Sequence, residues 1–285
     1  MVDIIIINHG EDNMLEKCLE SIFNAADAAK LISSVTVRNS CGAYSPSFKI
    51  NVINGKNIGY GAACNECAKR GTEPYILFLN PDVIMQKNAL TAALDCIEFN
   101  PNIGILGIEL AYEDGSTQAS KMTFPTAKDL TRRASGGKRG YATSDQSITG
   151  EADWVLGAVI LVRRSAFEAV GGFDESFFLY FEEVDLAKRM LKASWRCFYC
   201  AEAKAVHICG GAGGVSPFCA MQMARSRLIY SARYFTEQEF KCIYHRTIYA
   251  EPFLRFVKAL LTGYNPISAY TAPLRGARSA MEMID

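Results

Sequence analysis

The chain of 285 residues is long enough for one large α/β domain or two small ones. Its composition, with 49% hydrophobic and 21% charged residues, is that of a globular protein with a sizeable core. Its 30 basic and 30 acidic residues give a formal net charge of zero, so the overall balance does not indicate nucleic acid as a partner. Residues 1–8 lack the basic segment and cleavage site of a signal peptide. No apolar run approaches the roughly 20 residues of a membrane-spanning helix. We therefore expect a cytoplasmic protein.

The first half of the chain alternates strand and helix patterns. Short apolar runs predict strands at 4–7, 35–37, 50–53 and 75–79. Helical spacing of apolar or small residues predicts helices at 15–22, 60–70 and 88–99. This alternation predicts an α/β fold with a doubly wound, mostly parallel sheet flanked by helices, in which ligands bind at the carboxyl ends of the strands. The polar residues expected at that edge are Asn8, Arg38, Asn39, Asn80 and Asp82.

The second half begins with a polar segment at 112–150, which includes Ser-Gly-Gly-Lys-Arg-Gly at 135–140, and we expect a long loop there. Strand patterns return at 154–162 and 197–206, and the pattern becomes helical from about residue 216. We therefore place one α/β domain at residues 1–215 and a C-terminal helical region at 216–285.

The C-terminal region carries an amphipathic and basic pattern. Residues 241–285 contain six basic and three acidic residues, a net charge of +3. Such a tail suits either a position on anionic lipid or packing against the α/β domain, and the sequence leaves both open. The apolar face expected here consists of Phe253, Phe256, Val257, Leu260 and Leu261.

The ten cysteines are too few for a disulfide scaffold in a chain of this length, so we expect free thiols in a reducing cytosol. Cys64/Cys67 and Cys197/Cys200 have the CxxC spacing of zinc ligands. The second pair lies in a strand-like segment, where residues three apart point to opposite faces and cannot readily chelate one ion. We interpret both pairs as buried structural thiols.

Two adjacent carboxylates, Glu182 and Glu183, follow the bulky, mostly apolar residues 177–181. Burying such a pair without partners is too costly, so it must meet solvent, a cation, a metal or a substrate. A carboxylate beside an apolar wall is a candidate general base, because desolvation raises its pKa. On these residues alone, an acidic first turn that complements a helix dipole is an equal alternative.

Several other polar residues can each be interpreted as structural or as functional. Asp82 follows a buried strand and either caps the next helix or binds a divalent cation that holds a diphosphate. His207 ends a strand-like run before the glycine-rich segment 210–214, where it is either structural or a metal or phosphate ligand. Arg225 and Arg227 lie on a predicted helix, as a solvated face or as a phosphate clamp.

Six short motifs, in the same order, resemble glycosyltransferase family 2, and within it the rhamnosyltransferase-like enzymes of bacterial surface-polysaccharide assembly. The resemblance extends from residue 3 to about residue 235. The GxG within 57–65 lacks the third glycine of a dinucleotide fingerprint, so a dehydrogenase is not indicated. The motifs lie at 57–65, 77–82, 153–158, 171–175, 180–186 and His207.

The resemblance implies a GT-A fold and inverting transfer of a sugar from a nucleotide-sugar, of the dTDP-rhamnose or UDP-sugar type, to a glycan or lipid-linked glycan acceptor. It places such an enzyme in the cytoplasm or at the inner face of the plasma membrane. Asp82 is then a ligand of Mn²⁺ or Mg²⁺, His207 a further ligand, and Glu183 the catalytic base, with Glu182 beside it. The donor-binding residues expected are Asn8, Arg38, Asn39, Asn57, Gly59, Asn65, Asn80, Arg225 and Arg227. The sugar or acceptor pocket is expected at Asp153, Trp154 and Gly157.

Two departures from the family pattern lie on the nucleotide side. Where many relatives carry Val-Asp-Asn-Ala-Ser, this chain has Val-Arg-Asn-Ser-Cys at 37–41, and Arg38 cannot accept the hydrogen bond that an aspartate accepts from a base. The Asn-Tyr-Asn of the family is replaced by Asn-His-Gly at 8–10. These changes motivate an alternative, a degenerate member that binds a sugar, a lipid-linked glycan or a partner without catalysis. The sequence leaves open the donor sugar, the acceptor and the oligomeric state.

Overall fold

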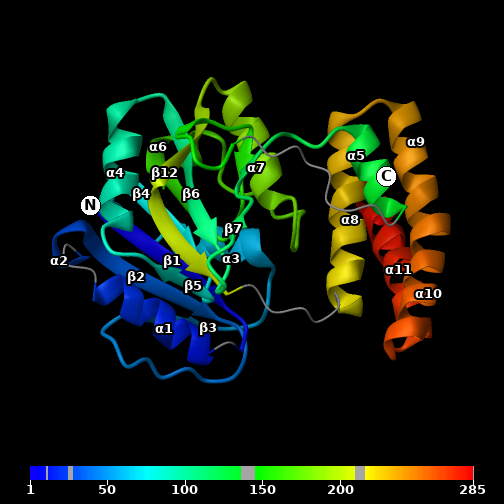
Figure 1. The fold of residues 1–285 in the computed structure, drawn as a ribbon, viewed down its shortest axis with the longest axis horizontal. Coiled ribbons are helices and arrows are strands. Elements are labelled where there is room, and N and C mark those ends of the chain that lie inside the picture. Colours follow the sequence, from blue (N-terminus) through cyan, green and yellow to red (C-terminus); the bar gives the residue numbers. More distant parts are fainter. Residues whose placement is uncertain (11, 25–27, 136–144, 209–215, 285) are drawn as a thin grey trace. The chain divides into compact units, whose positions relative to one another are not determined.

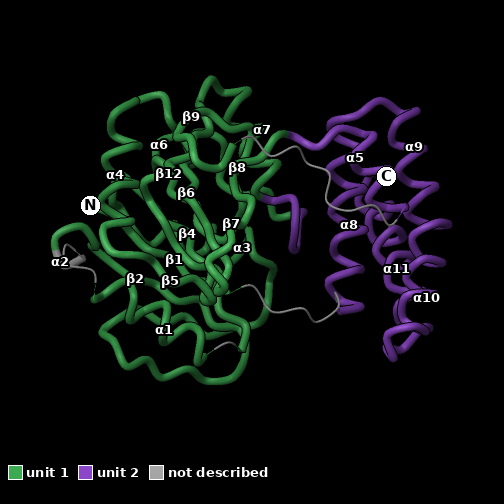
Figure 2. Tube along the Cα trace, viewed as in Figure 1, with its two compact units in different colours: residues 1–123, 143–175, 183–211 green, residues 124–142, 176–182, 212–285 purple. Residues whose placement is uncertain are grey.

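The structure is a computed structural model that describes all residues except 11, 25–27, 136–144, 209–215 and 285 (Figure 1). The chain divides into two compact units (Figure 2). Unit 1 consists of residues 1–123, 143–175 and 183–211, and unit 2 of residues 124–142, 176–182 and 212–285. The helical unit 2 therefore includes two segments that precede residue 216 in the chain.

Unit 1 is built on a mixed, largely parallel sheet (Figure 1). Its parallel half has the order β3-β2-β1-β4, with strands β1 (Val2–Asn8), β2 (Ile32–Asn39), β3 (Asn51–Asn54) and β4 (Tyr75–Leu79). The order continues as β11-β6-β12-β5, with β11 (Val159–Arg163), β6 (Ile103–Ala111), β12 (Arg196–His207) and β5 (Val83–Met85). β11 is antiparallel to both of its neighbours, and β12 is parallel to β6.

The remaining elements of unit 1 cover the sheet or extend it. β7 (Thr117–Gln118) pairs with β6 and β9 (Gly150–Glu151) with β12, while β8 (Lys121–Met122) and β10 (Trp154–Val155) form a separate pair. The helices are α1 (Asp12–Phe23), α2 (Ala28–Leu31), α3 (Tyr60–Ala68), α4 (Ala89–Phe99), α6 (Arg164–Ala169) and α7 (Glu182–Lys192), of which Glu182 itself is grouped with unit 2.

The core lies on both faces of the sheet, because successive side chains of a strand point to opposite sides. On one face, residues such as Ile4 and Leu79 pack with Leu15 of α1 in a single apolar cluster. On the other face, Phe78 contacts Phe167 and Phe173, with ring centroids 5.3 and 5.1 Å apart. Burial on both faces explains why the central strands are continuous apolar runs in the sequence.

The expected α/β architecture is confirmed, and two local expectations are wrong. The segment 112–150 is not one loop: its described part contains β7, β8, β9 and a helix, α5 (Ala127–Ala134), which opens with a capping box between Thr126 and Asp129. Residues 136–144, most of the predicted glycine- and lysine-rich loop, lie outside the described residues. The strand expected at 154–162 is two strands, β10 and β11, which belong to different sheets.

Unit 2 is helical. Besides α5 it contains α8 (Pro217–Tyr234), α9 (Glu237–His245), a π-helical turn η1 (Arg246–Ala250), α10 (Glu251–Thr262) and α11 (Pro266–Ile284). The fully buried guanidinium of Arg227 pairs with Glu251 and bonds Thr247 at 2.9 Å. Among the described residues, no helix has both the length and the apolar character required to cross a bilayer.

The packing of α8 against α11 gives a stability prediction. A Cβ added at Gly276 would overlap the backbone oxygen of Met221 and lie 3.1 Å from Cβ of Ala224. Gly276→Ala is therefore expected to lower the free energy of unfolding by about 1–3 kcal/mol, the usual cost of overpacking. The measurement is the urea midpoint followed by circular dichroism. The exposed Arg275→Ala, on the same helix, is the control and should stay within about 0.5 kcal/mol; equal losses for both variants would contradict the packing argument.

Candidate functional site

An asparagine ladder crosses the carboxyl ends of β1, β2 and β3. Asn8 Nδ2 donates to Asn39 Oδ1 at 3.1 Å, and Asn39 Nδ2 donates to Asn54 Oδ1 at 2.9 Å. The three residues are also paired in the parallel register of the strands. Asn8 and Asn39 are fully buried, so the ladder supplies the hydrogen bonds that their amide groups need. It fixes the edge of the sheet at which donor-binding residues were predicted.

Arg38 lies beside this ladder with its guanidinium turned to protein groups. Its Nε donates to Glu66 of α3 at 2.8 Å, and its Nη atoms donate to the carbonyls of Asn39 and Lys56 at 3.2 and 3.1 Å. The Arg38 side chain is 6% exposed, against 37% for Glu66. A Cβ on Gly55 would lie within 3.0 Å of the guanidinium carbon, so glycine leaves room for the arginine there. The unusual residue is thus accommodated by a carboxylate from the neighbouring helix.

Asp82 and His207 meet at the same edge of the sheet, although 125 positions separate them in the chain. β5 begins directly after Asp82 and pairs with the end of β12, with Val83 opposite His207. The Ile208 amide donates to the Asp82 carbonyl at 2.9 Å. As a result, Nε2 of His207 lies 3.3 Å from Oδ1 of Asp82, and both residues are 9% exposed.

Gln118 orients the imidazole of His207. Its Oε1 lies 2.9 Å from Nδ1 of His207. A carboxamide oxygen at this distance accepts a hydrogen from Nδ1, which leaves Nε2, the atom facing Asp82, available as a ligand in the neutral ring. Sequence reasoning missed Gln118 because its two-residue strand lies in the polar segment that was expected to be a loop.

Glu183 lies in the first turn of α7, opposite Gly157. A Cβ built on Gly157 would be 3.8 Å from both Cδ and Oε1 of Glu183, which is ordinary van der Waals contact, so Gly157 lies directly beside the carboxylate. Tyr60 Oη donates to the carbonyl of Gly157 at 3.4 Å. Glu183 is partly exposed, whereas Glu182 is 6% exposed. The structure therefore gives the two adjacent carboxylates different environments.

The residues that lead into α7 are strained. Tyr180 and Phe181 have φ values of +71° and +69°. Bulky residues rarely adopt this left-handed region, and each such residue costs on the order of 1 kcal/mol or more. Strain of this kind persists where the surrounding structure fixes the backbone, and it is concentrated at functional sites.

Asn57 and Gly59 precede α3, and Asn65 lies within it. Asn57 Oδ1 accepts from the Gly59 amide at 3.0 Å, and Gly59 uses a φ of +92° as the cap of the helix. The side chain of the buried Asn65 bonds both backbone groups of Phe173, at 2.8 and 2.9 Å. In this structure Asn65 faces a turn of the protein, whereas Asn57 is exposed. The Asn80 amide donates to the Ala158 carbonyl at 2.9 Å, which ties the 80–82 turn to β11.

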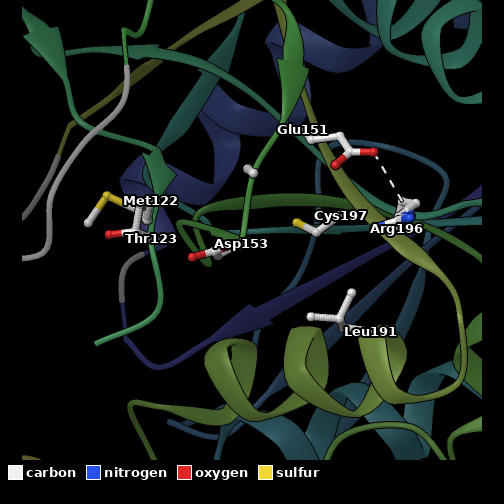
Figure 3. Close-up of a pocket in the computed structure, with 8 residues that line it drawn as sticks. Met122, Thr123, Glu151, Asp153, Leu191, Arg196 and Cys197 are labelled. Carbon is white, nitrogen blue, oxygen red and sulfur yellow. Dashed lines mark ion pairs between the residues drawn. The ribbon is translucent and has the colours of Figure 1, made fainter. Parts of the chain in front are cut away.

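Asp153 directly precedes the two-residue strand β10, which begins at Trp154. Asp153 lines a cavity of about 310 Å³ with Leu191 and Cys197 (Figure 3). Leu191 lies eight residues after Glu183 on α7, which corresponds to about 12 Å along the helix. Trp154 is buried and donates its indole hydrogen to the Thr123 carbonyl at 2.8 Å. Gly157, the third predicted sugar or acceptor residue, lies opposite the Glu183 carboxylate.

Arg225 and Arg227 belong to unit 2 and have partners there. Arg225 donates to the Ser176 carbonyl at 2.7 Å and to Ser279 at 3.2 Å. The guanidinium of Arg227 is 1% exposed and pairs with Glu251, so in this structure it faces protein groups and not a ligand. The glycine-rich segment 210–214 that was predicted beside His207 lies outside the described residues.

The architecture is that of the GT-A glycosyltransferases. The chain is similar in fold to "GalNAc-T7 with UDP, GalNAc and Mn2+", with a TM-score of 0.62 and 12% identity over 99% of this chain and 55% of that chain. It is also similar to the mannosyltransferase PcManGT from Pyrobaculum calidifontis "in complex with GDP-Man and Mn2+", with a TM-score of 0.56 and 14% identity over 99% of this chain and 86% of that chain. At these identities the likeness concerns the fold alone.

The chain belongs to glycosyltransferase family 2, which matches residues 3–171. It is 33% identical over 179 residues to an N-acetylglucosaminyl-diphospho-decaprenol L-rhamnosyltransferase of Mycobacterium tuberculosis, a match that covers 54% of this chain and 56% of that protein. It is 29% identical to the rhamnosyltransferase WbbL of Escherichia coli K12, over 73% of this chain and 83% of that protein. The chain thus spans little more than half the length of the mycobacterial relative.

The contacts of Arg38 give a prediction that separates support of the fold from ligand binding. Arg38→Ala leaves two carbonyls and one carboxylate without their charged donor, and we expect the free energy of unfolding to fall by about 2 kcal/mol. Urea unfolding of Arg38→Ala, Glu66→Ala and the double variant, analysed as a double-mutant cycle, should give a coupling energy of about 1–2 kcal/mol. Unchanged stability with weakened nucleotide binding would instead assign the guanidinium to a ligand.

Proposed function

We propose that this chain is an inverting, metal-dependent glycosyltransferase that moves a sugar from a nucleotide-sugar to a hydroxyl of a glycan or lipid-linked glycan in surface-polysaccharide synthesis. The observation that carries the proposal is the position of Asp82 and His207 together at the carboxyl edge of a GT-A sheet. Membership of the family and the rhamnosyltransferase names of the relatives support a rhamnose donor and a lipid diphosphate-linked acceptor. We place the reaction in the cytoplasm, at or near the inner face of the membrane.

The donor set of Asp82 and His207 fits Mn²⁺ or Mg²⁺. In an octahedral site with bonds near 2.1 Å, adjacent ligand atoms are about 3.0 Å apart, and Oδ1 of Asp82 and Nε2 of His207 are 3.3 Å apart. No group of three or more His, Cys, Asp or Glu that could hold a metal occurs among the described residues. A cation held by only two side chains uses phosphate and water oxygens as its other ligands, which suits a diphosphate donor. When bound, the metal would stabilise the negative charge of the leaving diphosphate.

The proposed roles in unit 1 follow from the positions of the side chains. Glu183 takes the proton of the acceptor hydroxyl as the oxygen of that hydroxyl attacks the anomeric carbon, and Gly157, which has no side chain, lies beside the carboxylate. Gln118 keeps the imidazole of His207 in the ligand orientation. The ladder of Asn8 and Asn39, with Asn57 and Asn80 nearby in the edge loops, forms the donor side. Arg38 acts there by holding Glu66 and the 55–57 loop.

A catalytically inactive binder is the second candidate. It was suggested mainly by Arg38, and the contacts of Arg38 weaken that reason. The arginine has three protein partners, so its presence does not by itself mean that donor binding is lost. The two candidates differ in a single respect, turnover, and the variants below measure it directly.

Glu183→Gln is expected to lower the rate of transfer by about 10²–10⁴-fold, because a carboxamide cannot accept the proton that the acceptor hydroxyl loses. Donor binding should be retained, since the shape of the side chain is preserved. Glu182→Gln is the matched control, one residue away and more buried, and should lower the rate far less. A transfer assay with radiolabelled nucleotide-sugar measures both; equal rates for Glu183→Gln and the wild type would remove Glu183 as the base.

Donor and metal are tested by thermal shift with dTDP-rhamnose and with UDP- and GDP-sugars, each with and without Mn²⁺. At a ligand concentration of 100 Kd, binding stabilises the folded protein by about 2.7 kcal/mol, or roughly 5 °C in a chain of this size. We expect such a shift for one nucleotide, only with metal, and its loss in Asp82→Asn. A shift that does not depend on metal would sink the role of Asp82, and no shift with any donor would favour the inactive binder.

A further inference from the structure

The polarity of α10 is the reverse of that expected for a surface helix. In a globular protein the apolar stripe of such a helix faces the core. In α10 the buried residues are Glu251, Pro252 and Ala259, of which Glu251 is 5% and Ala259 4% exposed. The exposed residues are Phe253 at 62%, Leu254 at 40%, Val257 at 38%, Leu260 at 59% and Leu261 at 82%. At 100° per residue, these five side chains occupy an arc of about 120°.

A buried ion pair fixes this orientation. Glu251 bonds the fully buried Arg227 of α8, and its other oxygen lies 2.8 Å from Nη2 of Arg255. Burial raises the pKa of Glu251, but the charges of Arg227 and Arg255 outweigh that effect and lower it, so the carboxylate is ionised at neutral pH. An ionised carboxylate with these partners cannot turn outward without leaving Arg227 buried and unpaired. The apolar arc of α10 is therefore held outward.

Neighbouring residues extend the arc into a larger surface. Tyr249 precedes α10, and Tyr264, Ile267 and Tyr270 follow it; each is at least 42% exposed. Phe256, which the sequence predicted on the apolar face, is half-buried and contacts Tyr270 instead. The apolar surface, as we call it, consists of Tyr249, Phe253, Leu254, Val257, Leu260, Leu261, Tyr264, Ile267 and Tyr270. Single exposed apolar residues are ordinary, but nine of them within residues 249–270 mark an interaction site.

The charges around the apolar surface have one sign. Between residues 246 and 270 the only acidic residue is Glu251, which two arginines neutralise. Of the basic residues in this stretch, Arg255 pairs with Glu251 on the inner side of the helix, whereas Arg246 and Lys258 are exposed, Lys258 beside the arc. Each basic residue near an anionic membrane contributes about 1 kcal/mol of attraction. Tyrosines beside leucines and a phenylalanine suit the boundary between headgroups and acyl chains, where an amphipathic ring meets both.

We propose that the apolar surface of α10 and its flanks binds an anionic lipid bilayer, with the arc in the headgroup region and the basic residues on phospholipid phosphates. A second copy of the chain is a poorer occupant, because a two-fold contact through this surface would bring Lys258 toward its equivalent. The inference goes beyond the proposed transfer reaction and does not rest on it, since it follows from exposure and charge in unit 2 alone. It would, however, bring the enzyme to the place where a lipid-linked acceptor lies.

The test is sedimentation of the full chain with vesicles of phosphatidylcholine, with and without phosphatidylglycerol. We expect the wild type to bind the anionic vesicles, and Phe253→Ser/Leu261→Ser to bind at least tenfold more weakly. Lys258→Glu should weaken binding to anionic vesicles only. Phe99→Ser is the matched control, because Phe99 is 92% exposed on α4 of unit 1 and belongs to no such surface; it should bind as the wild type does.

Other occupants of the surface give distinct results, and each would overturn the proposal. If a second copy covers it, sedimentation velocity will show a wild-type dimer that Phe253→Ser/Leu261→Ser converts to a monomer, without vesicle binding by either. If another part of this chain covers it, the double variant will melt several degrees lower and the wild type will not bind vesicles. The nucleotide-sugar thermal shift is measured on the same proteins, so failure of membrane binding and failure of donor binding are read separately.

Discussion

The pairing of β5 with the end of β12 is the contact on which the proposed site depends. β5 has only three residues, yet its antiparallel register sets Val83 against His207 and so brings Asp82 to the imidazole. The rest of the edge is arranged around this pair: Gln118 of β7 orients the ring, and the 80–82 turn is tied to β11. A carboxylate and a histidine buried together need such a fixed frame, because each loses its hydration and must be compensated by the other or by a cation.

The sequence predicted the parallel half of the sheet because burial on both faces leaves a simple pattern, a continuous apolar run such as 75–79. It predicted that Asn8 and Asn39 lie together for the same reason, since neighbouring parallel strands end at one edge of the sheet. It could not predict β5 or β7, because two or three residues carry no periodicity. Nor could it place Asp153, whose position depends on the switch of the chain between β10 and β11.

Arg38 illustrates how a residue can look disruptive in the sequence and be well accommodated in the fold. Read along the chain, it removes an acceptor from the donor side of the site. In three dimensions it meets Glu66 of α3, and Gly55 provides the space for its guanidinium. A partner 28 positions away cannot be found from a local motif, because ion pairs between elements follow from packing and not from spacing. The compensating carboxylate keeps an acidic group on this edge, with more than a third of its side chain exposed.

In unit 2, the tendency of the apolar residues of α10 to be buried conflicts with the ion pair between Glu251 and Arg227. Leu260 and Leu261 turned outward lose the burial that would stabilise the helix by about 1.5–3 kcal/mol each. A repacked arrangement that buried them would require Glu251 to rotate away from Arg227, and breaking a buried ion pair costs about 3–5 kcal/mol, which offsets what the burial of the two leucines returns. The inner ion pair thus specifies which face is presented, and the apolar face is left for an environment outside the chain. An anionic bilayer provides partners for both parts of that face, because its acyl chains bury the leucines and its phosphates attract the lysine beside them.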